Sequence, residues 1–492
     1  MKLAEYTVLD GMGLHALIAA GEVTAVEVAQ AALAAIDAVN PRINAVLEDW
    51  PDEAIAQALA ADTARAAHVA QRPLAGVPFL LKDLGIAMRG RKTEMCSRLA
   101  TGSTASEDSF LMTRFREAGL VTLGRTTTPE FAVSTTTESR MHGPTRNPWH
   151  LEHGAGGSSG GAAAAVAAGI VPIAHATDGG GSIRVPASCT GLFGLKPSRG
   201  RVSNAPFVDE VWNGLGTHFA ISRSVRDSAA LLDAVNGGAI GEPYEIAPPR
   251  ASYLAETRHA PHTLKIAYMP HPFNDTCTAP AVADALDDVA KRLLALGHHV
   301  DEAAPNLGAS WDAFVLCNAR IWAANAAMRV DAIVATTGRA ADVEYLEPAT
   351  LAVYRYGREL GAVELLSALQ VRNTVTRALG RFFAGYDLLL TPTLPALPPR
   401  IGEYNRVETS VDGLGWIAHV FSQSPFTALS NVSGTPAMSV PLSIDPQAGL
   451  PIGSHFMAGF GREDLLFRLA GQLEAAYPWR GQLPKVWAGA LD

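Results

Sequence analysis

The sequence predicts an α/β protein built on a large mixed, mostly parallel twisted sheet that is flanked by helices on both faces. Short apolar runs, which are typical of buried strands, alternate along the chain with segments of helical periodicity. This alternation favours parallel strands that are covered by helices. The chain has 492 residues and shows neither a fixed-period repeat nor a low-complexity linker. We therefore expect a single large domain over residues 1–492, with enough core for an extended sheet.

Local patterns predict the individual elements. Thr24 and Glu27 form a capping-box pattern, in which the hydroxyl and the carboxylate each bind a free backbone N–H. Apolar residues then recur at helical spacing until Pro41, where we expect this helix to end. An amphipathic helix is expected at 279–296 and a mainly helical cover at about 308–380. Short apolar runs predict strands at 77–81, 119–124, 169–176, 264–268, 298–300 and 387–392.

The composition excludes several classes of protein. With 48% hydrophobic and 18% charged residues, the chain is too apolar to be disordered. A net charge of −9 leaves no basic stripe for phosphates, so we expect no nucleic-acid partner. The best candidate for a membrane span, residues 160–174, is too short and contains Pro172. Met1 is not followed by an apolar signal region, and the four cysteines are dispersed, so we expect a cytoplasmic protein without a metal site.

The most informative segment contains two loops of small residues, 156–161 and 177–186. They are separated by one alanine-rich helix and one strand. Three consecutive glycines in the second loop let the backbone approach a ligand closely, and their N–H groups can converge on one oxygen. A hydroxyl beside such donors, here that of Ser182, is the arrangement of acyl transfer. A plain glycine turn and a phosphate-binding loop are the alternatives.

A serine nucleophile needs a base, and lysine is one candidate. Only seven of the 39 basic residues are lysines, and Lys82 stands at the end of an apolar strand. A lysine base must be neutral, so its pKa has to fall from about 10.4 to about 7–8, which burial among apolar residues achieves. An ordinary surface lysine is the alternative. Four nearby histidines have no obvious placement for this role: His142, His150, His153 and His175.

Two other motifs are matched only in part. Residues 156–160 fit G-x-S-x-G, the nucleophile elbow of α/β-hydrolases, but that elbow follows a strand and residues 149–154 do not predict one. Residues 11–16 fit the dinucleotide-binding pattern G-x-G-x-x-A, but Asp37, at about the expected distance for the acid, lies in a predicted helix. A nucleotide-binding oxidoreductase is therefore the alternative from a different class of protein.

Together these segments resemble the amidase signature family over nearly the whole chain. Lys82 lies in the block 76–83, and the Gly-Gly-Ser-Ser-Gly-Gly block and residues 178–186 follow in family order. Ser158 precedes Ser182 by the 24 residues that the family pattern contains. Three further segments are similar to family members: 191–197, 431–436 and 449–453.

The resemblance implies a cofactor-free Ser–Ser–Lys triad. Neutral Lys82 would draw a proton through Ser158, whose own peptide bond would be cis, while Ser182 attacks the carbonyl and becomes acylated. Water would then release the acyl group. The main-chain carbonyl of Ala132 would contact the substrate. Four neighbouring residues would donate backbone N–H groups to the oxyanion: Gly179, Gly180, Gly181 and Ser182. Three more would fix the loops without carrying protons: Asp178, Arg184 and Ser159.

Two departures from the commonest family pattern are informative. Many members have threonine at the position of Gly179, and many have Lys-Thr-Asn where this chain has residues 125–127. Both differ from the A-type subunit of the amidotransferase that amidates glutamyl-tRNA. The Asp-Gly-Gly-Gly-Ser version, with residues 142–149 upstream, is more similar to the branch that contains 6-aminohexanoate cyclic dimer hydrolases. The catalytic A-type subunit of a tRNA-dependent amidotransferase is kept as the alternative within the family.

We therefore expect a hydrolase of amide C–N bonds that acts on a small-molecule amide or carbamate, linear or cyclic, as a monomer or homodimer. Nylon-type amides, aryl amides and urethanes are all within this class. Specificity is expected to reside in the cover at 308–380 and in residues 416–426. Five side chains there are candidates for an apolar pocket, with ordinary core as the alternative: Phe314, Cys317, Trp322, Trp416 and Phe421.

Overall fold

The computed structural model describes residues 1–67, 72–274 and 276–490. Its centre is an 11-stranded sheet in the order β1-β3-β2-β8-β10-β9-β14-β15-β13-β11-β12. The strands are β1 (Val46–Asp49), β2 (Pro78–Lys82), β3 (Val121–Thr126), β8 (Ile173–Asp178), β9 (Phe193–Lys196), β10 (Thr217–Ser222), β11 (Lys265–Tyr268), β12 (His299–Glu302), β13 (Leu388–Pro392), β14 (Ala437–Ile444) and β15 (Pro451–Ala458). Two small sheets pair β4 (Glu138–Ser139) with β5 (Gly143–Pro144) and β6 (Arg146–Asn147) with β7 (His150–Gly154).

Helices surround this sheet. They are α1 (Leu3–Thr7), α2 (Gly11–Ala20), α3 (Ala25–Ile43), α4 (Pro51–Ala66), α5 (Phe110–Ala118), α6 (Gly160–Ala167), α7 (Arg184–Thr190), α8 (Val225–Val235), α9 (Tyr253–Glu256), α10 (Pro280–Ala295), α11 (Trp311–Thr337), α12 (Pro348–Glu359), α13 (Ala362–Phe382), α14 (Gly413–Gln423), α15 (Ala428–Ser433) and α16 (Glu463–Ala476). Every residue of β2, β3, β8, β9, β10, β13 and β15 is buried. Since neighbouring side chains of a strand point to opposite faces, both faces of these strands are covered.

The predicted large mixed sheet flanked by helices is confirmed, but the expectation that it is mostly parallel is wrong. Four neighbouring strand pairs are parallel and six are antiparallel. The antiparallel strands β10, β9, β14 and β15 follow one another in the middle of the sheet. Strands that are buried on both faces carry the same continuous apolar pattern in either direction, so the pattern does not reveal their orientation.

All six strands predicted from apolar runs are present, as β2, β3, β8, β11, β12 and β13. The expectation of no strand before Gly156 is wrong, because β7 covers His150–Gly154. β7 pairs with β6, forms a single bridge from His153 to Arg400 and lies outside the large sheet, so four of its five residues are at least partly exposed and it has no apolar run. The nucleophile elbow, which stands at the end of a strand in the main sheet of α/β-hydrolases, is therefore not reproduced.

Helix α3 has the predicted N-terminus and a later end. The Glu27 N–H donates to Thr24 Oγ1 at 3.1 Å, and the Glu27 carboxylate accepts from the Thr24 N–H at 2.8 Å. The helix continues past Pro41 to Ile43 and ends at Asn44, which has a left-handed φ of 49°. Pro41 removes its own N–H and crowds the carbonyl four residues earlier, which weakens the last turn without preventing it. The fully buried Ile43 holds the final turn against the core.

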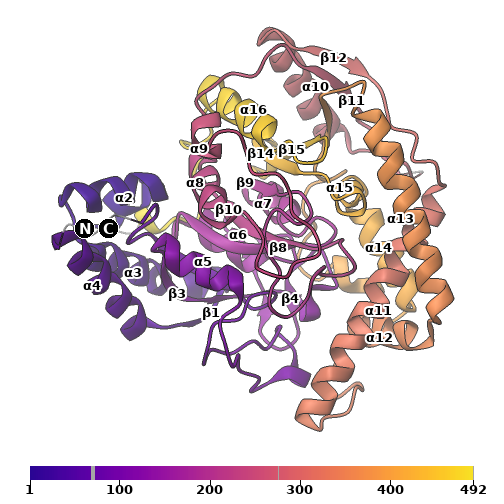
Figure 1. Cartoon of the computed structure of the whole chain (residues 1–492), viewed down its shortest axis with the longest axis horizontal. Helices are drawn as coiled ribbons and strands as arrows, with labels where there is room; N and C mark the ends of the chain where they lie inside the picture. Colours follow the sequence, from indigo (N-terminus) through magenta and orange to yellow (C-terminus); the bar gives the residue numbers. More distant parts are fainter. Residues whose placement is uncertain (68–71, 275, 491–492) are drawn as a thin grey trace.

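Helices α11, α12 and α13 form the predicted cover at 308–380 and lie on the side of the molecule opposite to α2, α3 and α4 (Figure 1). The two chain ends lie next to one another beside α2 (Figure 1). Across the described residues, no helix is both long and apolar enough to cross a membrane.

The glycine pattern at 11–16 is the first turn of α2 and not a dinucleotide loop. The segment before it is helix α1, with no strand. The carboxylate of Asp227 accepts from the Gly11 N–H at 2.7 Å and from the Met12 N–H at 2.9 Å. A phosphate would need these same donors. The oxidoreductase alternative therefore loses the motif on which it rested.

Candidate active site

Lys82 is the last residue of β2, and its ammonium group lies among three hydroxyls. β2 and β8 are parallel neighbours, so their carboxyl ends meet at one edge of the sheet. Lys82 Nζ lies 2.6 Å from Ser158 Oγ, 3.1 Å from Ser159 Oγ and 2.8 Å from Thr177 Oγ1. The glycine–serine loop before α6 and the end of β8 thus converge on one lysine, as the sequence motifs predict.

The charge of Lys82 is set by its burial. Its residue is 1% exposed, and burial lowers the pKa of the ammonium to about 7, although Asp178 and Cys96 act in the opposite direction. A substantial fraction of Lys82 is therefore neutral near pH 7. This is the shift that a lysine base requires.

Ser158 and Ser182 line the same cavity. The Gly157–Ser158 peptide bond is cis, as the family resemblance implies. A side chain on Gly157 would place its Cβ 2.7 Å from the backbone of Thr136, so the loop can approach that segment only with glycine here. Ser182 Oγ forms no hydrogen bond with Ser158 or with another residue in the described ranges, and catalytic hydrogen bonds are often longer before substrate binds.

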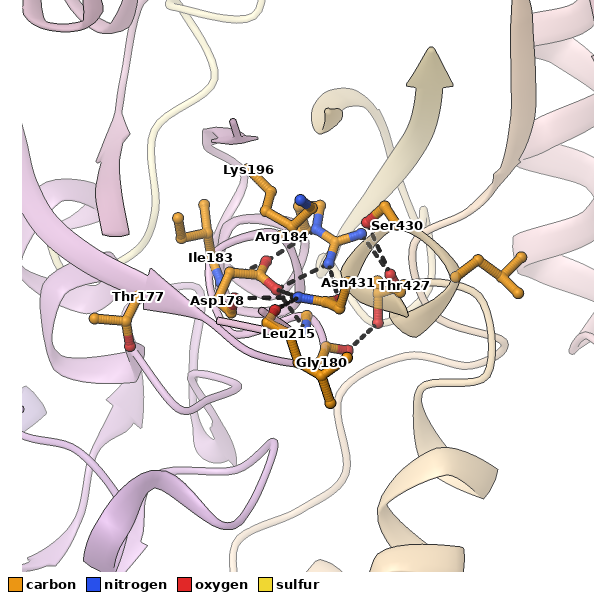
Figure 2. Close-up of polar contacts among 12 residues, drawn as sticks. Thr177, Asp178, Gly180, Ile183, Arg184, Lys196, Leu215, Thr427, Ser430 and Asn431 are labelled. Carbon is orange, nitrogen blue, oxygen red and sulfur yellow. Dashed lines mark hydrogen bonds and ion pairs between the residues drawn. The ribbon is translucent and has the colours of Figure 1, made fainter. Parts of the chain in front are cut away.

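Asp178 and Arg184 form a buried ion pair that shapes the second loop (Figure 2). Arg184 donates from Nε and Nη2 to the two carboxylate oxygens, at 2.9 Å each, and both side chains are fully buried. Burial alone would raise the pKa of Asp178, but Arg184, Lys196 and Asn431 hold it well below its usual range. Asn431 of α15 bonds both partners, to Asp178 Oδ1 and from Arg184 Nη2, at 2.8 Å each. The pair thus ties the loop to α15.

The three glycines of this loop differ in their surroundings. The Gly181 N–H donates to Asp178 Oδ1 at 2.8 Å, so it is engaged and not free for an oxyanion. The N–H groups of Gly179, Gly180 and Ser182 donate to no group in the described part of the chain. The carbonyl of Gly180 accepts from Thr427 Oγ1 at 2.6 Å, which holds the loop from the opposite side (Figure 2).

Ala132 lies on a turn with an unusual backbone. In η2 (Glu130–Ala132), Phe131 and Ala132 have left-handed φ values of 51° and 57°. Such conformations cost roughly 1–3 kcal/mol each in non-glycine residues and cluster at active sites. Buried Glu130 supports the turn, since it accepts from Ser97 Oγ at 2.6 Å and from the Glu347 N–H at 2.8 Å. Ala132 lines the same cavity as the two serines.

Most of the chain matches one known protein family. A model of the family described as Amidase matches residues 27–467. The chain belongs to the amidase family. The 6-aminohexanoate-cyclic-dimer hydrolase of Paenarthrobacter ureafaciens is 36% identical to this amidase over 489 residues, covering 97% of this chain and 96% of the relative.

Solved structures agree with this assignment. A 6-aminohexanoate cyclic dimer hydrolase superposes with a TM-score of 0.91 at 34% identity, over 98% of this amidase and 99% of that chain. A bacterial aryl acylamidase of the amidase signature family superposes with a TM-score of 0.87 at 26% identity, over 96% and 97% of the two chains. The A-type subunit of the glutamyl-tRNA(Gln) amidotransferase of Thermotoga maritima, at 24% identity and a TM-score of 0.72, shares the fold. This protein is an amidase, a hydrolase of amide C–N bonds.

The cavity of this amidase has a volume of about 730 Å³. Its walls come from residues 84–87 and 103–106, from η2, from the loop 204–217 and from one face of α11. The predicted helical cover thus contributes one face of α11, and Leu365 of α13, to the wall of the cavity. Among the described residues, no group of three or more His, Cys, Asp or Glu is arranged to hold a metal ion.

The five predicted pocket residues do not line this cavity. All are at most 2% exposed and belong to a second hydrophobic core under the helical cover: Phe314, Cys317, Trp322, Trp416 and Phe421. The expectation that they line a pocket is wrong, and the alternative of ordinary core is correct. Helical periodicity identified the buried face of α11, whereas the cavity is lined by the adjacent, less buried face.

Two tryptophans explain why the amidase needs glycines after Asp178. A Cβ on Gly180 would lie 2.7 Å from the Trp322 ring, and one on Gly179 would lie 3.1 Å from the Trp212 ring. Trp212 also packs on Trp322, with ring centroids 4.7 Å apart, and lines the cavity. Gly179 therefore leaves room for Trp212, and Gly180 leaves room for Trp322.

Sequence reasoning missed Thr177, Asn431 and Trp212. Thr177 immediately precedes Asp178 in the loop motif, and Asn431 begins a segment that resembles the family, so both had a sequence signal. Trp212 had none, because only the folded loop brings it to Gly179.

Proposed function

We propose that this amidase hydrolyses amides, and carbamates of similar size, through an acyl-enzyme on Ser182 with Lys82 as the base. The observation that carries the proposal is the position of Lys82 Nζ, buried and 2.6 Å from Ser158 Oγ. No histidine is needed for this arrangement, since serine–lysine variants of the catalytic triad perform the same chemistry.

In the first step, Ser182 Oγ attacks the substrate carbonyl while its proton passes to Ser158 Oγ. Ser158 gives its own proton to neutral Lys82 Nζ, which becomes an ammonium. The N–H groups of Gly179, Gly180 and Ser182 are free to stabilise the oxyanion, and each such donor is worth about 2.7–4 kcal/mol in related chemistry. Gly181 shapes the loop instead, because Asp178 holds its N–H.

In the second half, Lys82 returns the proton through Ser158 to the leaving nitrogen, and the amine departs. Water then attacks the acyl group on Ser182 and gives its proton to the same relay, which regenerates the free enzyme. Ser159 and Thr177 keep Lys82 Nζ in line with Ser158, since they lie 3.1 Å and 2.8 Å from it. Asp178 and Arg184 carry no proton in this scheme.

The size of the cavity supports a substrate larger than a simple primary amide. A volume of about 730 Å³ accommodates a chain of several methylenes or an aryl group. The relatives named as 6-aminohexanoate cyclic dimer hydrolase and aryl acylamidase support nylon-type and aryl amides as the substrate class. We also propose a stand-alone cytoplasmic enzyme, monomeric or homodimeric. All four cysteines are free, which supports a reducing compartment.

The test is intact mass spectrometry after incubation with a reactive aryl ester or a fluorophosphonate. We expect one adduct on the wild type, located on Ser182 by peptide mapping, and no adduct on Ser182→Ala. Ser188→Ala is the matched control, because this serine is also buried, in α7, but has no part in the scheme. An adduct that persists in Ser182→Ala would contradict the proposal.

A further inference from the structure

Three charged side chains line the cavity, and two of them have a counter-charge. They are Asp178, Glu210 and Arg329. Asp178 is paired with Arg184, and Glu210 lies 3.9 Å from Arg372. Arg329 forms neither an ion pair nor a side-chain hydrogen bond with any residue in the described ranges. Arg329 is an exposed residue that lines the cavity. The protein around the guanidinium displaces part of its hydrating water, which lowers the pKa of Arg329, and no acidic group acts in the opposite direction.

Arg329 lies on the cavity face of α11, further along the helix than the tryptophan that packs against the oxyanion loop. Trp322, on the same helix, packs against Gly180 in the oxyanion loop. Arg329 is seven residues further along, which corresponds to about 10 Å at 1.5 Å per residue. Asn325 and Ile333, one turn to each side of Arg329, line the same cavity. The helix therefore forms a wall from the oxyanion loop to the arginine.

The lining of the whole cavity is largely apolar. It is formed by side chains from several parts of the chain, including Ile86, Phe131, Val211, Trp212 and Met328. Such a wall favours a hydrocarbon linker and offers little to a polar one. An extended chain that covers about 10 Å has roughly nine bonds, and fewer are needed if the flexible arginine reaches inward.

We propose that Arg329 binds a carboxylate at the far end of the substrate, so that the preferred substrates are amides whose scissile carbonyl and carboxylate are separated by an apolar linker. The proposal rests on the proposed function of the site and specifies its substrate class. A single guanidinium matches a monoanion in charge and forms paired hydrogen bonds with a planar carboxylate. A dianionic phosphate would require a second cation, and Arg329 is the one cationic side chain among the described residues that line the cavity.

The experiment compares two matched pairs of amides. Suberic acid mono-p-nitroanilide and octanoyl p-nitroanilide differ by a carboxylate on the acyl fragment. The second pair, ε-acetamidocaproate and N-hexylacetamide, differs by a carboxylate on the amine fragment. For at least one pair we expect wild-type kcat/KM to be about three- to tenfold higher for the carboxylate, as for a partly exposed ion pair.

Three variants distinguish the role of Arg329. Arg329→Gln should abolish the preference by lowering kcat/KM for the carboxylate alone, and high salt should weaken the preference in the wild type. Arg329→Glu should reverse it. Arg355→Gln is the matched control, since Arg355 is an exposed arginine of α12 that does not line the cavity, and it should leave the preference unchanged. Equal ratios in wild type and Arg329→Gln for both pairs would overturn the proposal.

A binding measurement separates this proposal from the proposed function. Calorimetry on Ser182→Ala, with and without Arg329→Gln, gives the ratio of Kd values for each pair without turnover. A carboxylate preference that depends on Arg329 would support the subsite even if turnover failed. Turnover of octanoyl p-nitroanilide, lost in Ser182→Ala, tests the Ser182 mechanism independently. If both members of each pair had equal Kd values, with and without Arg329→Gln, the carboxylate subsite would be contradicted. The Ser182 mechanism would be unaffected by that result.

Discussion

Lys82 and Lys196 are both buried in this amidase, and their immediate neighbours differ. Their residues are 1% and 0% exposed, and burial lowers the pKa of each to about 7. Lys82 Nζ contacts the hydroxyls of Ser158, Ser159 and Thr177. Lys196 Nζ donates instead to the backbone carbonyl of its neighbour Pro197, at 2.9 Å.

The comparison shows that a lowered pKa alone does not identify a base. Lys82 ends β2 beside the cavity, whereas Lys196 ends β9 and Arg184 further lowers its pKa. A carbonyl can accept a hydrogen bond but has no proton to pass on. A hydroxyl can accept one proton and donate another, so only Lys82 has a route to the substrate.

The largest expected difference between the two lysines is in turnover. Lys82→Met should lower kcat at least about a thousandfold, because removing a member of a catalytic triad removes the proton route. Lys196→Met, which replaces a lysine of similar size and burial, should keep kcat within about fivefold. Steady-state kinetics on one amide measures both. A Lys82→Met enzyme with more than a tenth of wild-type activity would place the base elsewhere.

A smaller effect is expected from Thr177→Val, which removes one hydroxyl beside Lys82 and keeps the shape of the side chain. In the wild type, kcat/KM should rise tenfold per pH unit up to about pH 7 and then level off, because neutral Lys82 is the active form. The Thr177 hydroxyl accepts from the ammonium at 2.8 Å and stabilises the charged form. Thr177→Val should therefore move the midpoint to lower pH and reduce the plateau about five- to thirtyfold.

The pH profile of Lys196→Met provides the control for that measurement. Its midpoint should stay at about 7, the pKa of Lys82. A midpoint that moved in Lys196→Met but not in Thr177→Val would show that the pH profile reports the titration of Lys196. That result would contradict the assignment of the midpoint to Lys82.

The smallest effect is on stability, where we expect the two lysines to behave alike. Both have a native pKa of about 7 and an unfolded pKa near 10.4. Between these values the unfolded chain binds a proton that the native protein lacks, so the free energy of unfolding rises with pH by up to about 1.4 kcal/mol per unit for each lysine. Below about pH 7 both states are protonated and the slope disappears.

Urea unfolding at pH 7.5 and 9.5 measures this slope. Lys82→Met and Lys196→Met should each reduce the rise in unfolding free energy between these pH values by about 2–3 kcal/mol relative to the wild type. Other titrating groups are common to all three proteins and cancel in the difference. An unchanged slope in either variant would show that the replaced lysine stays charged in the native protein.

Much of the architecture could be predicted because it depends on short segments. The six apolar runs became strands, and Thr24 with Glu27 forms the expected capping box. The motifs also predicted that Lys82, Ser158 and Ser182 meet, and the structure places Lys82 against Ser158 and both serines on one cavity.

Other features could not be predicted from short segments of the sequence. Strand direction was misjudged because a strand covered on both faces has no directional pattern. The apolar face of α11 was identified correctly as apolar but assigned to the pocket, since periodicity shows which residues avoid water and not what covers them. Arg329 had no signal, because its isolation from acidic groups is a property of the folded cavity.

The sequence by itself determined the family, the order of the catalytic segments and the residue types that the chemistry requires, since all of these are written in contiguous motifs. Only the tertiary structure decided which lysine meets hydroxyls, which glycine N–H is taken by Asp178 and which arginine is left without a partner among the described residues. Except for the contact of Asp178 with Gly181, which depends on the shape of one loop, these features depend on distances between residues far apart in the chain. They follow from the packing of strands and helices against one another, and proton transfer and charge recognition depend on them at the scale of a hydrogen bond.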